Sequence, residues 1–178
     1  MKTFMDDIKE GKNIATDAHT DAATAQSEVD ALETVVGAAQ GEIDALEGVV
    51  DARVKIAVVS LAGGAANAFA FAWQNPETVA ILVQRVLVDR DTAGGTATAV
   101  IDIGTAADAT TGSNNLIDGL DANATGLADN ISDAGSSGKA RQKLDAKDGG
   151  TDYITGQILV EAAASLAGKV YIEYVKVQ

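Results

Sequence analysis

Residues 28–36 read EVDALETVV and residues 42–50 read EIDALEGVV, so one nine-residue pattern recurs fourteen residues later. Fourteen residues are two heptads, and a heptad repeat of apolar residues is the signature of an α-helical coiled coil. Working outward from this repeat, the alternating spacing of three and four continues from Ile8 to Arg53, and no proline interrupts it. The pattern predicts one helix of roughly 70 Å.

The apolar residues of this helix form a seam that we expect to bind other copies of the chain. Its strongest positions, a and d of the heptads, are Val29, Leu32, Val36, Ile43, Leu46 and Val50. Valine or isoleucine at a with leucine at d favours a parallel dimer, but valines at the g positions 35 and 49 widen the stripe, which suits three strands or more. A lone amphipathic helix packed on its own domain is the alternative, but such helices seldom exceed about 25 residues. The seam therefore predicts an oligomer of this chain, in which the widened stripe suits three strands or more and a dimer is the alternative.

The first half of the seam is weaker than the second. Alanine occupies its a and d positions from residue 15 to residue 25, and Gly11 occupies the first d position. Small side chains bury little apolar area, so this half contributes little association energy. We expect the C-terminal domain, or a partner that clamps the N-terminus, to supply the remainder.

After Val54 the apolar period changes from helical to two, and glycines divide the chain into short segments. This change predicts an α+β chain by segments: a coiled-coil helix over residues 1–54, then an all-β antiparallel sandwich, jelly-roll-like, over residues 55–178. Residues 56–76 hold no charge, but glycine, serine and asparagine interrupt them, so two strands around Gly63-Gly64 are favoured over a membrane span.

Several strands are predicted by alternation and β-branched content. Residues 68–73 predict a strand with three aromatic rings on one face and three alanines on the other. The expected pairs are residues 78–90 with 96–103, as a hairpin turning at 91–95, and residues 153–162 with 169–177. Residues 78–90 read as a strand covered on both faces, and residues 104–138 as loops with a short helical turn or two around Leu116, Leu120 and Leu127.

Composition excludes several classes of function. Thirteen Lys and Arg stand against 26 Asp and Glu, and the net charge of -13 argues against nucleic acid as a partner. No cysteine is present, so disulfides, thiolate metal sites and cysteine nucleophiles are ruled out. The acidic first residues lack the apolar core of a signal peptide, which leads us to expect synthesis in the cytoplasm.

Few residues suggest chemistry, and we expect neither enzyme activity nor a cofactor. The single histidine, His19, is flanked by Asp17 and Asp21 and reads as a solvated side chain on the helix. A paired-carboxylate hydrolase using Asp89 and Asp102 is the last-ranked alternative, because a catalytic pair needs a cleft and a raised pKa.

A calcium loop is the one metal alternative. Its oxygen ligands would be Asp121, Asn123, Thr125 and Asp129, with glycine at the sixth position. The pattern lacks the bidentate glutamate that an EF-hand loop carries at its twelfth position, where Ser132 stands. We therefore expect a polar loop without an ion.

Four cations gather within nine residues of this acidic chain: Lys139, Arg141, Lys143 and Lys147. Their role is either functional, as a docking patch for an acidic surface or a salt-bridge set with a neighbouring subunit, or structural, as lysines that protect an exposed strand edge. The sequence leaves these two interpretations equal.

Four stretches resemble the β-domains of tailed-phage virion proteins, the head-decoration and head-fibre proteins. They are residues 69–77 (FAFAWQNPE), 103–111 (IGTAADATT), 115–120 (NLIDGL) and 168–174 (GKVYIEY), and the likeness covers roughly residues 65 to 178. The resemblance implies a non-enzymatic, trimeric protein displayed on a capsid surface, in contact with capsid or other virion proteins. A receptor- or glycan-binding fibre tip, with a host-surface glycan as partner, is the alternative.

Overall fold

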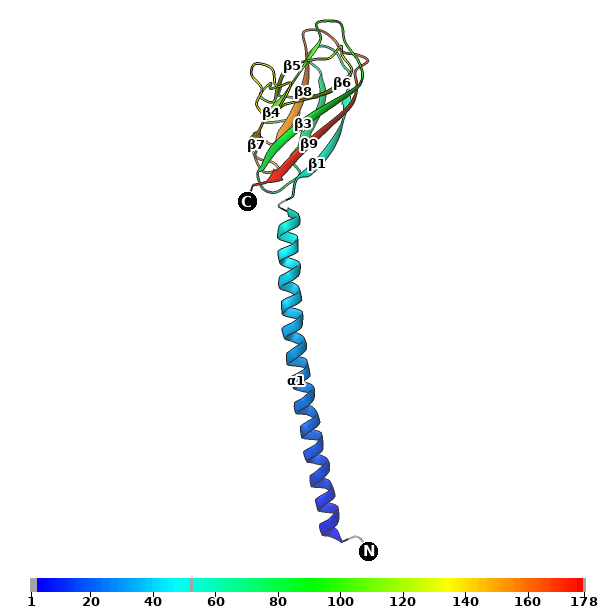
Figure 1. Ribbon diagram of the computed structural model, residues 1–178, viewed down its shortest axis with the longest axis vertical. Coiled ribbons are helices and arrows are strands. Elements are labelled where there is room, and N and C mark those ends of the chain that lie inside the picture. The colour runs from blue at the N-terminus through cyan, green and yellow to red at the C-terminus, as the bar shows by residue number, and fades with distance from the viewer. Residues whose placement is uncertain (1–2, 52, 178) are drawn as a thin grey trace. The chain divides into compact units, whose positions relative to one another are not determined.

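The computed structural model describes residues 3–51 and 53–177, although the side chains of residues 47–51 lie outside the description. The chain divides into two compact units, Met1–Val50 and Asp51–Gln178. Each unit is considered by itself below, and Figure 1 shows their elements.

The first unit is a single helix, α1 (Phe4–Asp51), which confirms the predicted long helix. Thr3 caps it. The Thr3 hydroxyl donates to Asp6 Oδ2 at 2.7 Å, and the Thr3 amide donates to the same oxygen at 3.1 Å. The hydrogen bond from the Thr3 amide to the side chain three residues on is one half of a capping box, with aspartate as the acceptor. These hydrogen bonds hold the pKa of Asp6 below its ordinary value, so its negative charge is kept at the positive end of the helix dipole.

The second unit is built from two antiparallel sheets that enclose one core (Figure 1). One sheet has the strand order β1-β9-β3-β6, with β7 also paired to β3, and the other has the order β2-β8-β4-β5. The strands are β1 (Lys55–Ala62), β2 (Phe69–Gln74), β3 (Ile81–Thr92), β4 (Val100–Ala106), β5 (Ile117–Asp121), β6 (Gly126–Asp129), β7 (Gln142–Leu144), β8 (Tyr153–Leu159) and β9 (Ala167–Lys176). The predicted sandwich of antiparallel sheets is therefore present.

The core lies between the sheets and is dominated by isoleucine and valine. The largest fully buried side chains are Ile81, Val83, Val86, Val88, Ile101, Ile103, Leu116, Ile117, Leu144, Ile154, Ile158 and Ile172. In β3 the buried residues alternate with half-buried ones, so only one face of this strand is fully covered. The expectation that both faces are buried was wrong, because most residues of the second face are only half-buried.

Both predicted strand pairings were wrong, for one physical reason. Strands β3 and β4 belong to different sheets, and so do β8 and β9. Each connection passes from one sheet to the other, so β3 pairs with β9 while β4 pairs with β8. Alternation within a strand predicts which residues are buried, but it carries no information on which strand lies alongside.

Two local predictions also fail. The predicted helical turns around Leu116, Leu120 and Leu127 are absent, because the first residue precedes β5 and the other two lie in β5 and β6. In β2 a bulge between Phe69 and Phe71 shifts the register. Ala70 and Phe71 are consequently both buried, and the predicted separation of rings from alanines is lost.

Backbone contacts tie three loops together at one end of the sandwich. Gly64 and Ala163 exchange two hydrogen bonds, at 3.2 and 2.9 Å, and the Ser165 amide donates to the Gly94 carbonyl. A Cβ on Gly94 would lie 2.1 Å from the backbone nitrogen of Leu166. Only glycine allows the connections β3–β4 and β8–β9 to approach this closely.

Candidate functional site

The seam, formed by the apolar a and d residues, is a long exposed stripe along the described part of α1. Every described side chain from Thr3 to Leu46 is exposed. The exposed fraction is 46% for Val29, 63% for Leu32 and 64% for Leu46. The seam residues Val36 and Ile43 are exposed as well; the side chain of Val50 lies outside the described residues. Scattered exposed leucines are ordinary in folded proteins, but a continuous stripe marks an interaction surface.

The residues of α1 outside the seam are largely polar, and those described are exposed. Gln26 donates to Asp30 at 2.7 Å and Gln40 donates to Asp44 at 2.8 Å, both with the four-residue spacing that joins neighbours on a helix surface. Gly37 and Gly41 have no neighbouring atoms where a Cβ would stand. Glycine disfavours a helix by about 1 kcal/mol relative to alanine, so these two positions lower the intrinsic helix propensity of this part of α1.

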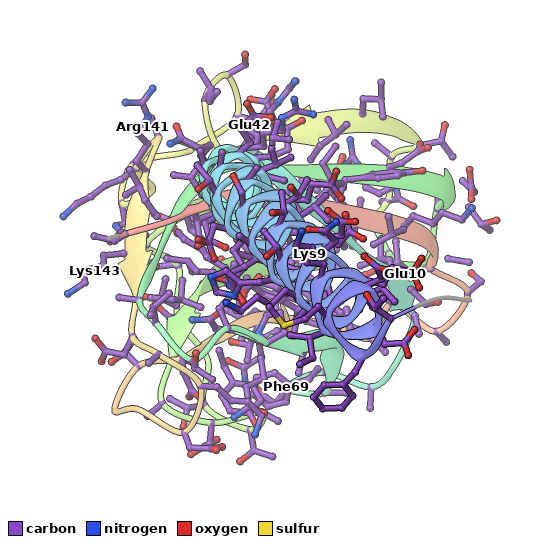
Figure 2. The ribbon with its side chains drawn as sticks, turned by 90° about the horizontal axis from the view of Figure 1, so that it is seen from below. Lys9, Glu10, Glu42, Phe69, Arg141 and Lys143 are labelled. Carbon is purple, nitrogen blue, oxygen red and sulfur yellow. The ribbon has the colours of Figure 1, made fainter. Side chains whose placement is uncertain are left out.

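The four clustered cations lie around β7. All four are exposed, and Arg141 and Lys143 extend away from the strand in Figure 2. Because β7 pairs only with β3, it is an edge strand, and Lys143 lies at its centre. Lys147 forms an ion pair of 3.0 Å with Asp148. The arrangement fits the protected-edge interpretation, in which lysine deters strand addition.

The structure does not bring the predicted calcium ligands together as a free set. Asp121 Oδ1 accepts the Asn123 amide at 2.7 Å, which makes a local turn. Asp129 binds the Arg85 guanidinium and accepts the amides of Ile131 and Ser132. Among residues 3–51 and 53–177 no group of three or more Asp, Glu or His side chains is arranged to hold a metal ion.

Asp129 instead anchors a loop, a role that sequence reasoning missed. The Ser132 amide is the strongest influence that lowers the pKa of this carboxyl, and the Arg85 guanidinium also lowers it against the effect of burial. The next residue, Asn130, is fully buried. Its Oδ1 accepts the Val86 amide at 2.7 Å, and its Nδ2 donates to the carbonyls of Lys139 and Ala140. Together the two residues hold the connection between β6 and β7 against β3.

A second unanticipated cluster joins the start of β1 to the end of β9. Glu77 accepts Lys55 Nζ at 2.9 Å, Lys176 Nζ at 3.3 Å and the Tyr174 hydroxyl at 3.2 Å. Burial by itself would raise the pKa of Glu77, but the two ammonium groups reverse this and hold it below its ordinary value. Tyr174 also lies against Trp73, with ring centroids 5.4 Å apart. The cluster is structural, since its groups satisfy one another.

An open pocket of about 420 Å³ lies beside β5 and β6, lined by Arg90, Asp118, Asp121, Leu127, Asp133 and neighbouring small residues. Arg90 is buried and donates to the backbone carbonyls of Asp121 and Gly126. The aspartates accept local donors: Asp118 binds Ser136 and the Ser137 amide, and Asp133 accepts the Asp129 amide. These polar groups of the pocket wall therefore form hydrogen bonds that stabilise the surrounding loops.

The carboxylates of the hydrolase alternative are not neighbours. Asp89 lies on the solvent face of β3, and Asp102 lies on the solvent face of β4 in the other sheet. Burial, aided by repulsion from Asp118, raises the pKa of Asp102 despite a hydrogen bond from the Gly119 amide. With the two faces on opposite sides of the core, this pair cannot flank one substrate bond.

The aromatic residues expected of a glycan-binding tip are mostly engaged in packing. Phe71 and Tyr174 are buried, and Trp73 packs on the core. His19 is exposed on α1. In the helical residues described, no stretch combines the length and apolar character needed to cross a membrane.

Comparisons with known proteins give no family. No family model matches the chain, and no curated protein matches it. Among solved structures it is similar to the VP2 protein in the subviral particle of infectious bursal disease virus, with 10% identity and a TM-score of 0.36. The match covers 70% of this chain and 33% of the viral chain, so the chain spans about a third of that protein's length.

Proposed function

We propose that the chain is a non-enzymatic structural protein of a virus particle, a homotrimer displayed on the capsid surface as a decoration or head-fibre protein. In this proposal α1 joins three copies in parallel, and the β-unit of each copy contacts capsid protein or projects from it. No cofactor is required.

The observation that carries the proposal is the exposed seam of α1. Leucine and valine at a and d positions leave more than half of Leu32, Val36 and Leu46 in water. Full burial of such a side chain contributes about 1.5–3 kcal/mol. The fold of one chain leaves most of each of these side chains uncovered, which favours their burial against the same seam of other copies.

The strand order supports the jelly-roll part of the proposal. In chain order β1 to β4 alternate between the two sheets, and the alternation resumes with β8 and β9. Repeated crossing between two antiparallel sheets is the connectivity of a jelly roll, an arrangement frequent in viral capsid domains; here one sheet has five described strands and the other four. The resemblance of residues 65–178 to phage virion β-domains points to the same class of protein. Fold by itself does not fix function, so the particle must be tested directly.

Two measurements test the proposal. Light scattering on the full chain should give a mass of about 54 kDa, three times the 18.1 kDa of one chain. Mass spectrometry of purified particles of the virus that encodes the sequence should detect the chain, and an antibody to the β-unit should label intact particles. A protein that is absent from purified particles would refute the virion role even if the trimer is found.

A further inference from the structure

Strand β1 carries an exposed apolar face that the helix seam does not explain. Its residues alternate, with Ala57, Val59 and Leu61 turned to the core. The exposed fraction is 62% for Ile56 and 57% for Val58. The exposed apolar side chains therefore lie on the side of the strand that faces away from the core.

The apolar face continues across the sheet. Val58 lies opposite Tyr171 of β9, and Tyr171 lies opposite Leu87 of β3. Residues opposite each other in antiparallel strands share a face. Val58, Tyr171 and Leu87 consequently form a three-strand apolar row on the solvent side of the sheet.

The edge formed by β1 is also unprotected. Among the strands that the structure describes, β1 pairs with β9 alone, so the other side of residues 56–62 has no strand alongside it. Residues 56–62 contain no charge and no proline. Proteins ordinarily blunt such edges with lysine, proline or short length, and β7 shows this in the same molecule, with three residues centred on Lys143. The lysine of β1, Lys55, lies at its first residue and is paired with Glu77. The seven residues that follow lack these features, which indicates a strand that is covered in the assembled protein.

The charges beside the apolar row suit a second copy of the chain. Glu173 lies opposite Arg85 on one side of the row, and Lys169 lies opposite Asp89 on the other. Both signs are thus present next to the row, in a chain whose overall charge is -13. A contact between copies here can place opposite charges together, whereas most of this acidic surface would repel itself.

Chain connectivity favours β1 as the contacting strand. Only residues 52–54 separate the end of α1 from the start of β1, so the chain cannot separate the two by more than about 14 Å. A parallel bundle of three helices therefore holds three copies of β1 at a high local concentration. The weak, alanine-rich half of the helix seam leaves association energy to be supplied by such a contact.

We propose that the β1 face, defined by Ile56, Val58, Tyr171 and Leu87, is a second subunit interface that packs against the β1 region of neighbouring copies. This inference rests on the proposed homotrimer and adds a contact to it. The β-unit then takes part in assembly, and each copy's exposed edge is shielded from strand addition by foreign chains.

The absence of cysteine makes a direct test simple. We would introduce Val58→Cys into the full chain and, as a matched control, Leu127→Cys. Leu127 is 64% exposed, close to the 57% of Val58, and it lies on β6 at the other edge of the same sheet. The mass of each variant is measured first by light scattering, and a short bismaleimide is then added to the native protein at several dilutions. The products are separated on a denaturing gel.

For Val58→Cys we expect a two-chain band that persists on dilution. For Leu127→Cys we expect no two-chain band. A trimeric mass with no two-chain band for Val58→Cys, or with an equal band for the control, would overturn the β1 interface while leaving the helical trimer intact. A monomeric mass for both variants and for the unmodified chain would overturn the trimer as well, and with it this interface.

Discussion

Leu46→Asp is the substitution that most sharply tests the helix seam. Leu46 occupies a d position and is 64% exposed in one chain. About two thirds of the roughly 1.5–3 kcal/mol available from burying a leucine is therefore gained on assembly, or about 1–2 kcal/mol per chain. Three chains lose about 3–6 kcal/mol together, and each buried carboxylate adds a desolvation cost of several kcal/mol.

A loss of at least about 3 kcal/mol lowers the assembly constant by about 100-fold or more, since about 1.4 kcal/mol corresponds to a factor of ten. Light scattering over a dilution series should show Leu46→Asp falling to the single-chain mass at concentrations where the unmodified protein remains a trimer. Ala45→Asp is the matched control, because it adds the same charge one residue away at an exposed outer position. If Leu46→Asp kept the mass of the unmodified protein at every dilution, the seam assignment would be wrong.

Three further substitutions probe the β-unit. Val160 has a φ of 68°, a left-handed conformation that a β-branched side chain adopts only under strain, so Val160→Gly should raise the unfolding free energy by about 1 kcal/mol in denaturant titrations, and an equal or lower value would contradict the strain. Gly94→Ala should lower the melting temperature of the β-unit because its Cβ meets the Leu166 backbone; unchanged melting would show that this approach is not close in solution. The ionised form of Asp129 is favoured by folding, so its stabilisation is present above the ordinary carboxyl pKa of about 3.9 and is lost as the pH falls through the lower folded value. Asp129→Asn should therefore lose less unfolding free energy than the unmodified protein as the pH is lowered in denaturant titrations. An equal loss in both proteins would refute the assignment.

The helix was predictable because its information is local. The heptad spacing from residue 8 onward defines both the helix and its apolar face without reference to any other segment. Strand existence was predictable for a similar reason, since β-branched alternation marks β3 and β8 directly. Partner choice was not predictable: β3 and β4 are joined by a short glycine-containing turn, yet the chain crosses between sheets there.

The polar residues of the β-unit were hard to interpret for a related reason. Asp129 reads as a calcium ligand from spacing alone, but its partner Arg85 is 44 residues away in the sequence. Buried Asn130 gave no signal in a loop rich in asparagine and aspartate. A local pattern indicates which groups can bind, whereas the fold decides which groups meet.

The central claim is that the exposed seam of α1 is buried against copies of itself. The most direct measurement is the absolute mass of the full chain in solution, compared with that of a chain that begins at Val54. The account predicts about 54 kDa for the full chain, three times 18.1 kDa, and a smaller assembly or looser association when the helix is removed. A monomeric mass for the full chain at every concentration would contradict the account.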